Sequence, residues 1–364
     1  MAATVRVLVV DDSPDDRARL SRILKGKRGL RLQVVPPPSI LDARDLAGWH
    51  PDVAVIDYQL TEREHGREPA TFKGSTLAAA LREKLPEIPI VLITRQYMVS
   101  TGRFAAARDL QGAFDELVMK EAIYKDSDEF AATLIHLAKG FRTLRSCRPR
   151  NWKSLQAVLK ADDLEQQELL RADPPPEVLA GHTWRVSEVA RWILDTVLRY
   201  PGIIYDSLHA AVALGLSRES FLKPSVQAFF KTALFRGVFA PSDPHFWKTR
   251  MLTKARALLR ETHMPDAAFT DFAKAWRRRH GTVLAPAVCN TSEGTPADSV
   301  CYILREPVLR RFSLPYHPDT RPLVMDEARV SFKAIRKDNR YDERLFPPDA
   351  RPLLDAIQRG DNLQ

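Results

Sequence analysis

The chain of 364 residues has few cysteines and no long apolar segment. Three cysteines, Cys147, Cys289 and Cys301, are too few and too odd in number for a disulfide framework, which predicts a reducing, cytoplasmic compartment. No apolar run approaches the roughly 18–20 residues of a membrane-spanning helix, so we expect no membrane partner. The first apolar run is short and ends on two aspartates, which does not fit a signal peptide.

The short motifs of common enzymes are also missing. The sequence contains no Gly-rich phosphate-binding loop, no nucleophile elbow, and no cyclase or phosphodiesterase signature. From the sequence alone we therefore expect a protein without an enzymatic activity of its own. The net charge of +9 excludes no class of partner. Residues 1–145 carry +2 of it, and the remaining residues carry +7. A basic second half permits contact with nucleic acid or with acidic partners.

Four short apolar runs stand out in the first 120 residues, and each leads into a polar residue. The runs and their following residues are Val5–Val10 with Asp11 and Asp12, Val53–Ile56 with Asp57, Ile88–Ile93 with Thr94, and Leu117–Met119 with Lys120. Such runs suit strands buried on both faces of a parallel sheet. Because open parallel sheets bind ligands at the carboxyl ends of their strands, we expect three carboxylates, a hydroxyl and an ammonium in one crevice.

Helical patterns separate these strands. Ser13 is a suitable helix cap, Pro14 suits the first helical position, and Asp15 and Asp16 suit the positive end of the helix dipole. Alternation from Leu30 to Val34 predicts an edge strand. Further helices are expected at 42–49, 74–85, 103–110 and 127–144. Strands alternating with helices predict a doubly wound α/β domain over about the first 145 residues.

The expected crevice suits phosphoryl transfer, which needs positioning and charge neutralisation more than elaborate covalent chemistry. A carboxylate can accept the phosphoryl group as an aspartyl phosphate. Paired Asp11 and Asp12 across from Asp57 suit Mg²⁺, which prefers oxygen ligands. Lys120 and Thr94 can each bind a phosphoryl oxygen. Three crowded acids would repel one another unless a cation sits among them.

On these residues, the region 1–145 resembles the receiver domain of bacterial two-component response regulators. The resemblance implies a flavodoxin-like fold with strand order 2-1-3-4-5, Asp57 as phospho-acceptor, Thr94 as switch hydroxyl and Lys120 as the family's lysine. It also implies Mg²⁺ bound by Asp12, Asp57 and the carbonyl of Gln59, with Asp11 acting mostly through water. A histidine kinase or phosphotransfer protein would be the partner.

Three positions depart from the family pattern. Leu117 stands where an aromatic switch residue is usual, Glu121 follows the lysine in place of proline, and Arg95 replaces a small residue. These departures predict normal phosphorylation with an unusual read-out.

The rest of the chain resembles no known output domain. We expect a helical, Pro-rich linker over 146–176 and a mostly helical α+β output domain over 177–364, with a hairpin formed by Val283–Cys289 and Val300–Leu304. A segment at 206–227 has spacing close to a helix-turn-helix, but Pro224 would end its second helix early. The basic run Arg277–Arg279 suits either phosphate contact or a solvated helix end.

Two hypotheses for the whole chain follow. The first is a response regulator that accepts a phosphoryl group on Asp57 with Mg²⁺ and signals through a C-terminal protein-interaction module. The alternative is a phosphorylation-controlled DNA-binding transcription regulator that uses the segment at 206–227.

Overall fold

The structure is a computed structural model that describes residues 4–38, 41, 43–60, 70–95, 114–147, 151–180, 185–289, 295–318, 324–337 and 341–360. The chain divides into two compact units that are each discontinuous in sequence. The first comprises Met1–Val158 and Pro175–Leu194, and the second Leu159–Pro174 and Asp195–Gln364. The limits 1–145, 146–176 and 177–364 remain a prediction.

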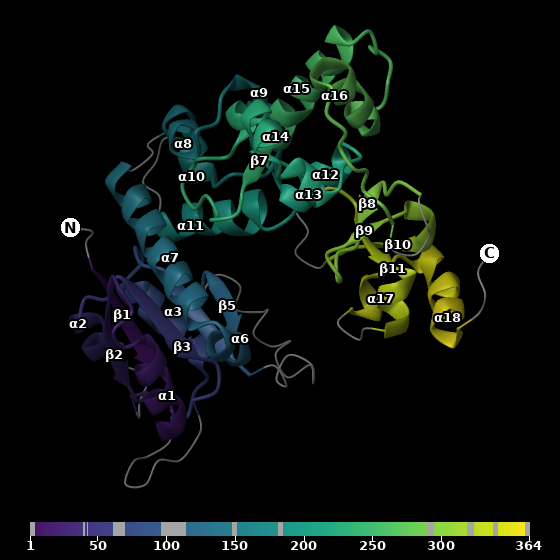
Figure 1. The fold of residues 1–364 in the computed structure, drawn as a ribbon. Coiled ribbons are helices and arrows are strands. Elements are labelled where there is room, and N and C mark those ends of the chain that lie inside the picture. The colour runs from purple at the N-terminus through teal and green to yellow at the C-terminus, as the bar shows by residue number, and fades with distance from the viewer. Residues whose placement is uncertain are drawn as a thin grey trace. The chain divides into compact units, whose positions relative to one another are not determined.

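A five-stranded parallel sheet forms the centre of the first unit (Figure 1). Its strands are β1 (Val5–Val10), β2 (Leu30–Val35), β3 (Val53–Asp57), β4 (Ile90–Thr94) and β5 (Glu116–Met119). They lie in the order β2-β1-β3-β4-β5, and every neighbouring pair is parallel. This order confirms the predicted flavodoxin-like fold, with β2 at one edge.

Helices cover both faces of the sheet. The helices of this unit are α1 (Pro14–Leu24), α2 (Arg44–Gly48), α3 (Gly74–Lys84), α6 (Lys120–Lys125), α7 (Ser127–Cys147), α8 (Trp152–Leu159), α10 (Pro176–Ala180) and α11 (Val186–Arg191). α7 packs against β1, β3 and α1, while α3 packs against β3, β4 and α2 (Figure 1). The predicted helix at 103–110 lies outside the described residues.

Strand side chains alternate between these two helical layers. Leu8 and Ile56 belong to one buried cluster with Leu77 and Leu81 of α3. Their neighbours along the strands, such as Val9, are equally buried, as expected for a sheet covered on both sides. The strands can therefore be near-continuous apolar runs, which is why the sequence revealed them.

Two helix starts near the strand ends differ in how well the sequence predicted them. Ser13 caps α1 by accepting a hydrogen bond from the amide of Asp16, as predicted. The short helix α6 was not predicted: it begins at Lys120 itself, immediately after β5. No cis peptide bond is present among the described residues.

The second unit is mostly helical. Its helices are α9 (Asp163–Arg171), α12 (Ser207–Ala213), α13 (Arg218–Phe221), α14 (Pro224–Phe229), α15 (Lys248–Glu261), α16 (Phe272–His280), α17 (Phe332–Lys337) and α18 (Arg351–Arg359). A π-helical segment, Trp192–Leu198, crosses from the first unit into the second and comes before α12 in the chain. One buried cluster is rich in aromatic rings, including Phe221, Phe246 and Trp276. A second gathers the C-terminal strands with α17 and α18.

The strands of this unit form three two-stranded antiparallel pairs. They are β6 (Ile204–Asp206) with β7 (His245–Trp247), β8 (Ser299–Val300) with β9 (Pro307–Val308), and β10 (Ser313–Tyr316) with β11 (Ala328–Ser331). The predicted hairpin of 283–289 with 300–304 is wrong. Val288 makes only an isolated bridge to Pro296, because β8 turns back to pair with β9 instead.

Within the described parts of the chain, no helix is both long enough and apolar enough to cross a membrane.

Candidate functional site

Three aspartates meet at the carboxyl ends of β1 and β3. Asp11 and Asp12 follow β1, and Asp57 is the last residue of β3. All three are buried, with 0%, 4% and 6% of their surfaces exposed. One carboxylate oxygen from each lies within 4.8 Å of the other two. The pairing of β1 with β3 places the two strand ends side by side.

The ammonium of Lys120 lies among these carboxylates. Its Nζ donates hydrogen bonds to Asp11 Oδ2 at 2.7 Å and to Asp57 Oδ2 at 2.8 Å. A third bond, at 2.7 Å, goes to Asp16 Oδ2 on α1. Only 2% of the lysine side chain is exposed, so these three carboxylates take the place of water around its ammonium.

The local backbone holds the acids in place. The amide of Ser13 donates to Asp11 Oδ1 at 3.0 Å, and the Arg17 guanidinium donates to the carbonyls of Asp11 and Asp12 at 3.0 and 2.8 Å. The start of α3 comes so close to Asp57 that a Cβ on Gly74 would lie 1.7 Å from the Asp57 carbonyl oxygen. Only glycine fits at that position.

Burial dominates the electrostatics of the cluster. It raises the pKa of Asp57 to about 7; the Lys120 charge opposes this rise and the Asp11 charge adds to it. Burial likewise raises the pKa of Asp11, against the opposing effect of Lys120. For Lys120, burial disfavours the ammonium, but the charges of Asp57 and Asp11 prevail and raise its pKa. One ammonium therefore does not offset all the negative charge gathered here.

The donor set fits a small divalent cation. Three carboxylates with oxygens less than 5 Å apart provide the hard oxygen ligands that Mg²⁺ prefers. A divalent cation would also favour the ionised forms of Asp11 and Asp57, whose pKa values are raised by burial and, to a lesser extent, by neighbouring acids. Asp11, Asp12 and Asp57 are the residues that would hold it.

The other predicted site residues lie close by in the fold. Thr94 is buried at the end of β4 and pairs in register with Met119, the residue before Lys120. Gln59 lies two residues beyond Asp57 and its side chain is exposed. Leu117 lies in β5 and packs against the apolar cluster that contains Leu92. Glu121 is exposed in the first turn of α6.

Sequence reasoning missed two residues of the site, Asp16 and Tyr124, and it noted Arg95 without its partner. Asp16 accepts hydrogen bonds from Lys120, from Arg95 Nη2 at 3.0 Å and from the Tyr124 hydroxyl at 3.0 Å. The sequence suggested only that Asp16 favours the helix dipole. No local signal pointed to this role, because the partners of Asp16 lie far along the chain, after β4 and in α6.

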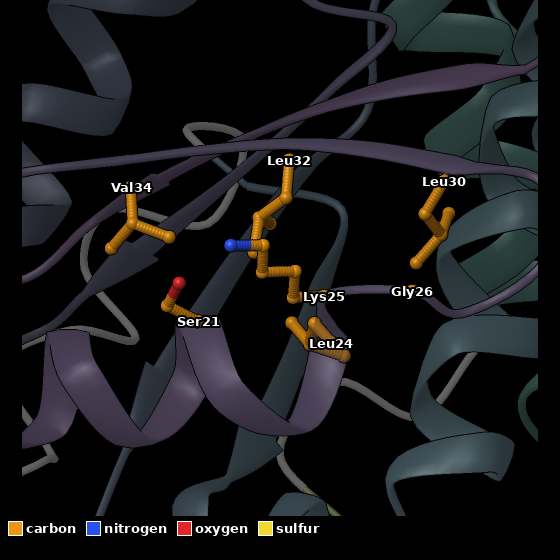
Figure 2. A pocket seen from close by; sticks show the side chains of 7 residues that line it. All are labelled: Ser21, Leu24, Lys25, Gly26, Leu30, Leu32 and Val34. Carbon is orange, nitrogen blue, oxygen red and sulfur yellow. The ribbon is translucent and has the colours of Figure 1, made fainter.

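A separate hollow of about 330 Å³ lies between α1 and the edge strand β2, away from the acids. Figure 2 shows Leu30, Leu32 and Val34 of β2 facing Ser21 and Leu24 of α1 across it. The lining combines four aliphatic side chains with Ser21, Lys25 and Gly26 and includes none of the acids. We therefore place the chemistry at Asp57 and not in this hollow.

The second unit contains a cavity of similar size, about 330 Å³. In its lining, Asp326 accepts hydrogen bonds from Tyr205 and, at 2.6 Å, from Lys248. Both carboxylate oxygens of Asp326 therefore already accept a hydrogen bond within the protein.

The two segments of this unit that the sequence suggested for nucleic-acid binding make contacts within the unit itself. α13, at the position of a recognition helix, has four residues, and Phe221 within it is fully buried. In the basic run, Arg278 donates to the carbonyl of Thr262 and Arg279 pairs with Glu261.

Comparisons with known proteins find similarity to curated proteins that are enzymes by name. No protein-family profile matches it. A protein-glutamate methylesterase/protein-glutamine glutaminase 1 of Cereibacter sphaeroides is 26% identical over 204 residues, which cover 54% of this chain and 52% of the relative. A second such protein, of the group 3 operon of Cereibacter sphaeroides, has the same identity and coverage. The chain thus spans about half the length of the curated relatives it matches.

Solved receiver domains also align with the chain. The signal receiver domain of the putative response regulator NarL from Mycobacterium tuberculosis is 25% identical and covers 38% of this chain and 98% of its own, with a TM-score of 0.28. The response regulator domain of Thermotoga maritima CheB is 17% identical and covers 36% and 96%, with a TM-score of 0.29.

The strand order and the acidic cluster at the strand ends agree with the resemblance of the first part of the chain to receiver domains of response regulators. The expectation of a chain without enzymatic activity is wrong, because the matching relatives are enzymes by name. Their match covers 54% of the chain, which is more than the 147 of 364 residues that reach the end of α7. The relation therefore extends beyond the receiver domain, where the sequence offered no recognisable enzyme motif.

Proposed function

We propose that the protein is a response regulator that accepts a phosphoryl group on Asp57 and thereby controls the second unit. The observation that carries this proposal is the buried Asp57 carboxylate, placed beside Asp11 and Asp12 and bonded to Lys120 at 2.8 Å. A buried group of like charges is costly for folding, so its presence points to chemistry at that position.

The geometry suits Asp57 as a nucleophile. Lys120 holds Oδ2, while Oδ1 has no hydrogen-bond partner among the described residues and is left to attack. With a phosphohistidine donor, a bond forms between Oδ1 and phosphorus as the phosphorus–nitrogen bond breaks, and the leaving imidazole takes a proton from water. Lys120 would stay beside the transferred group and bind one of its oxygens, with Thr94 as a further donor.

Mg²⁺ is the proposed cofactor, held by Asp11, Asp12, Asp57 and the carbonyl of Gln59. When bound, it would neutralise charge on the phosphoryl oxygens. The Ser13 amide keeps the Asp11 carboxylate oriented, and Arg17 holds the backbone carbonyls of Asp11 and Asp12. The phosphoryl donor would be a histidine kinase or a phosphotransfer protein, and the proposed location is the cytoplasm.

For the output, we favour a protein partner over DNA. A four-residue α13 with a buried Phe221 offers little surface to a DNA groove, and two of the three arginines of 277–279 already have partners in the second unit. A hydrolytic output like that of the relatives is a second candidate, because their match extends beyond the receiver domain.

Acetyl phosphate tests the acceptor. With Mg²⁺, intact-mass measurement should show one phosphoryl group on the wild-type chain and none on Asp57→Asn. Asp45→Asn, which changes an exposed aspartate of α2, is the matched control and should label like the wild type. Removing Mg²⁺ with a chelator should abolish labelling. Equal labelling of wild type and Asp57→Asn would overturn the proposal.

The output needs a separate experiment on the phosphorylated full chain. A protein partner predicts a complex whose affinity differs between wild type and Asp57→Asn after acetyl phosphate treatment. A DNA output predicts duplex binding that falls with salt and is lost on charge reversal at Arg277–Arg279. A hydrolytic output predicts ester hydrolysis that changes with phosphorylation.

A further inference from the structure

Asp16 joins three elements of the receiver domain at one carboxylate. From the first turn of α1 it accepts bonds from Lys120 at the start of α6, from Arg95 just after β4, and from Tyr124 in the body of α6. Oδ2 takes the two cations, and Oδ1 takes the Tyr124 hydroxyl. Asp16 is not among the three acids that suit the metal, so the metal site leaves this carboxylate unexplained.

Tyr124 is the residue that ties α6 to α1. Besides its bond to Asp16, its ring lies under the Arg19 guanidinium, 3.6 Å from the ring centroid. Asp16 and Arg19 are three residues apart on α1 and therefore share a helix face. Burial raises the pKa of Tyr124, and the bond to Asp16 adds to this, so the hydroxyl remains a donor.

Two neighbouring cations, Lys120 and Arg95, keep the Asp16 carboxylate ionised beside the Tyr124 hydroxyl. Burial raises the pKa of Asp16, but bonds from Lys120 and Arg95 outweigh it and bring the pKa down to about 2. The carboxylate is 11% exposed and the Arg95 side chain is 50% exposed. Arg95 is thus the cation with the most freedom to change partners.

We propose that Asp16 and Tyr124 are the read-out of the phospho-acceptor site: a phosphoryl group on Asp57 draws Arg95 and Lys120 away from Asp16, which releases Tyr124 and loosens α6. This inference rests on the proposed function of Asp57. It assigns to Asp16 a positioning role that acts through the two cations and through Tyr124.

Charge competition supplies the driving force. A phosphoryl group adds negative charge and three strong acceptor oxygens to a site where Lys120 already contacts Asp57 at 2.8 Å. The planar guanidinium of Arg95 matches phosphoryl oxygens well. Asp16 then loses the cations that offset its burial, so the carboxylate gains by turning toward water. Tyr124 loses its acceptor in that arrangement, and phosphorylation favours the state in which α6 is less firmly held.

Hydrogen exchange of the full chain with beryllium fluoride and Mg²⁺, a stable mimic of the phosphorylated acid, tests the inference. Peptides that contain Lys120–Lys125 should exchange roughly fivefold faster in the wild type when the mimic is bound, the scale of losing one hydrogen bond. In Tyr124→Phe and Asp16→Asn, exchange should be fast without the mimic and should change little when it is added. Binding of the mimic is measured separately by calorimetry.

Tyr58→Phe is the matched control. Tyr58 directly follows Asp57, but its hydroxyl faces Lys73 at 3.3 Å instead of Asp16. This variant should keep the full response of α6.

A response of α6 in Tyr124→Phe and Asp16→Asn equal to that of the wild type would overturn the inference. So would a wild type that binds the mimic without any change in α6, although the proposed acceptor role of Asp57 would then stand. A wild type that neither binds the mimic nor takes up phosphate would overturn the proposed function itself.

Discussion

The two units of the chain differ in how they group charge: among the described residues, three buried acids of the first unit share Lys120, whereas the buried Glu165 of the second is paired with Arg250. In the first, Asp11, Asp16 and Asp57 all point their carboxylates at one buried ammonium. In the second, pairs such as Arg279 with Glu261 lie where both side chains are about half exposed. Exposed pairs contribute little to stability, whereas buried groups of like charge cost stability. The contrast shows where this protein keeps an arrangement that folding alone would not favour.

The largest expected effect comes from removing the buried ammonium. Lys120→Met leaves Asp11, Asp16 and Asp57 without their shared donor, and we expect a loss of about 3–5 kcal/mol in the free energy of unfolding. Urea unfolding at neutral pH, followed by circular dichroism, measures it. Mg²⁺ should recover part of the loss, because a cation that binds the folded state stabilises it.

Lys125→Met provides the comparison within the same helix. Lys125 is exposed in the last turn of α6, and its replacement should change stability by less than about 0.5 kcal/mol. Similar losses of unfolding free energy in the two variants would show that the contacts of Lys120 with the buried acids do not stabilise the fold.

A methyl group at Gly74 tests the close approach of α3 to the acceptor. In Gly74→Ala the new Cβ would lie 1.7 Å from the Asp57 carbonyl oxygen and 2.7 Å from its carbon, so backbone must shift. We expect a loss of roughly 1–3 kcal/mol and slower phosphorylation of Asp57. Gly48→Ala, where a Cβ meets nothing within 4 Å, should cost no stability. Equal behaviour of the two variants in unfolding would contradict the packing argument.

The strand-end residues of the site were predictable because their signals are local. Val5–Val10 and Ile90–Thr94 are buried on both faces, so composition alone marks them, and parallel pairing brings their ends together. The contribution of Asp16 was not predictable from its surroundings in the sequence. Its contact with Lys120 spans 104 residues and depends on how α1 packs against the start of α6.

The second unit was less predictable for a related reason. Its strands are two to four residues long, which is too short for an alternating pattern to identify them. Val283–Cys289 has the composition of a strand, yet Ala287 is used to pack the C-terminal cluster and Val288 makes an isolated bridge. Tertiary packing overrides β-propensity there.

A smaller loss of stability is expected on changing Asp206, a carboxylate of the second unit that has several partners. It caps α12 through the amides of Leu208 and His209 and also pairs with Arg305. Burial raises its pKa, but the bond and charge of His209, with Arg305, bring the pKa well below its usual range. Asp206→Asn keeps a capping side chain and loses the charge, so we expect a loss of about 1 kcal/mol at neutral pH.

The pH dependence of that loss has a definite sign. A lowered pKa in the folded state means that the ionised group stabilises the fold above about pH 4, the usual value of an unfolded aspartate, and that this contribution fades as the pH falls further. The stability difference between wild type and Asp206→Asn should therefore shrink between neutral pH and acid. Unfolding curves at several pH values measure it, and a constant difference would exclude the ionic contribution.

The smallest effect is expected at Asp195, which pairs with Arg199 one turn away while the two side chains remain 40% and 58% exposed. Water already solvates both groups, and ordering two side chains costs about as much as their attraction gains, so Asp195→Asn should change stability by less than about 0.5 kcal/mol. The same urea unfolding experiment, run at low and high salt, measures this change. If this exposed pair cost as much to remove as Lys120, burial would not be what separates the two units. If its effect is small and vanishes in salt, the concentration of charge around Lys120 stands apart from the ordinary charge pairs of the fold.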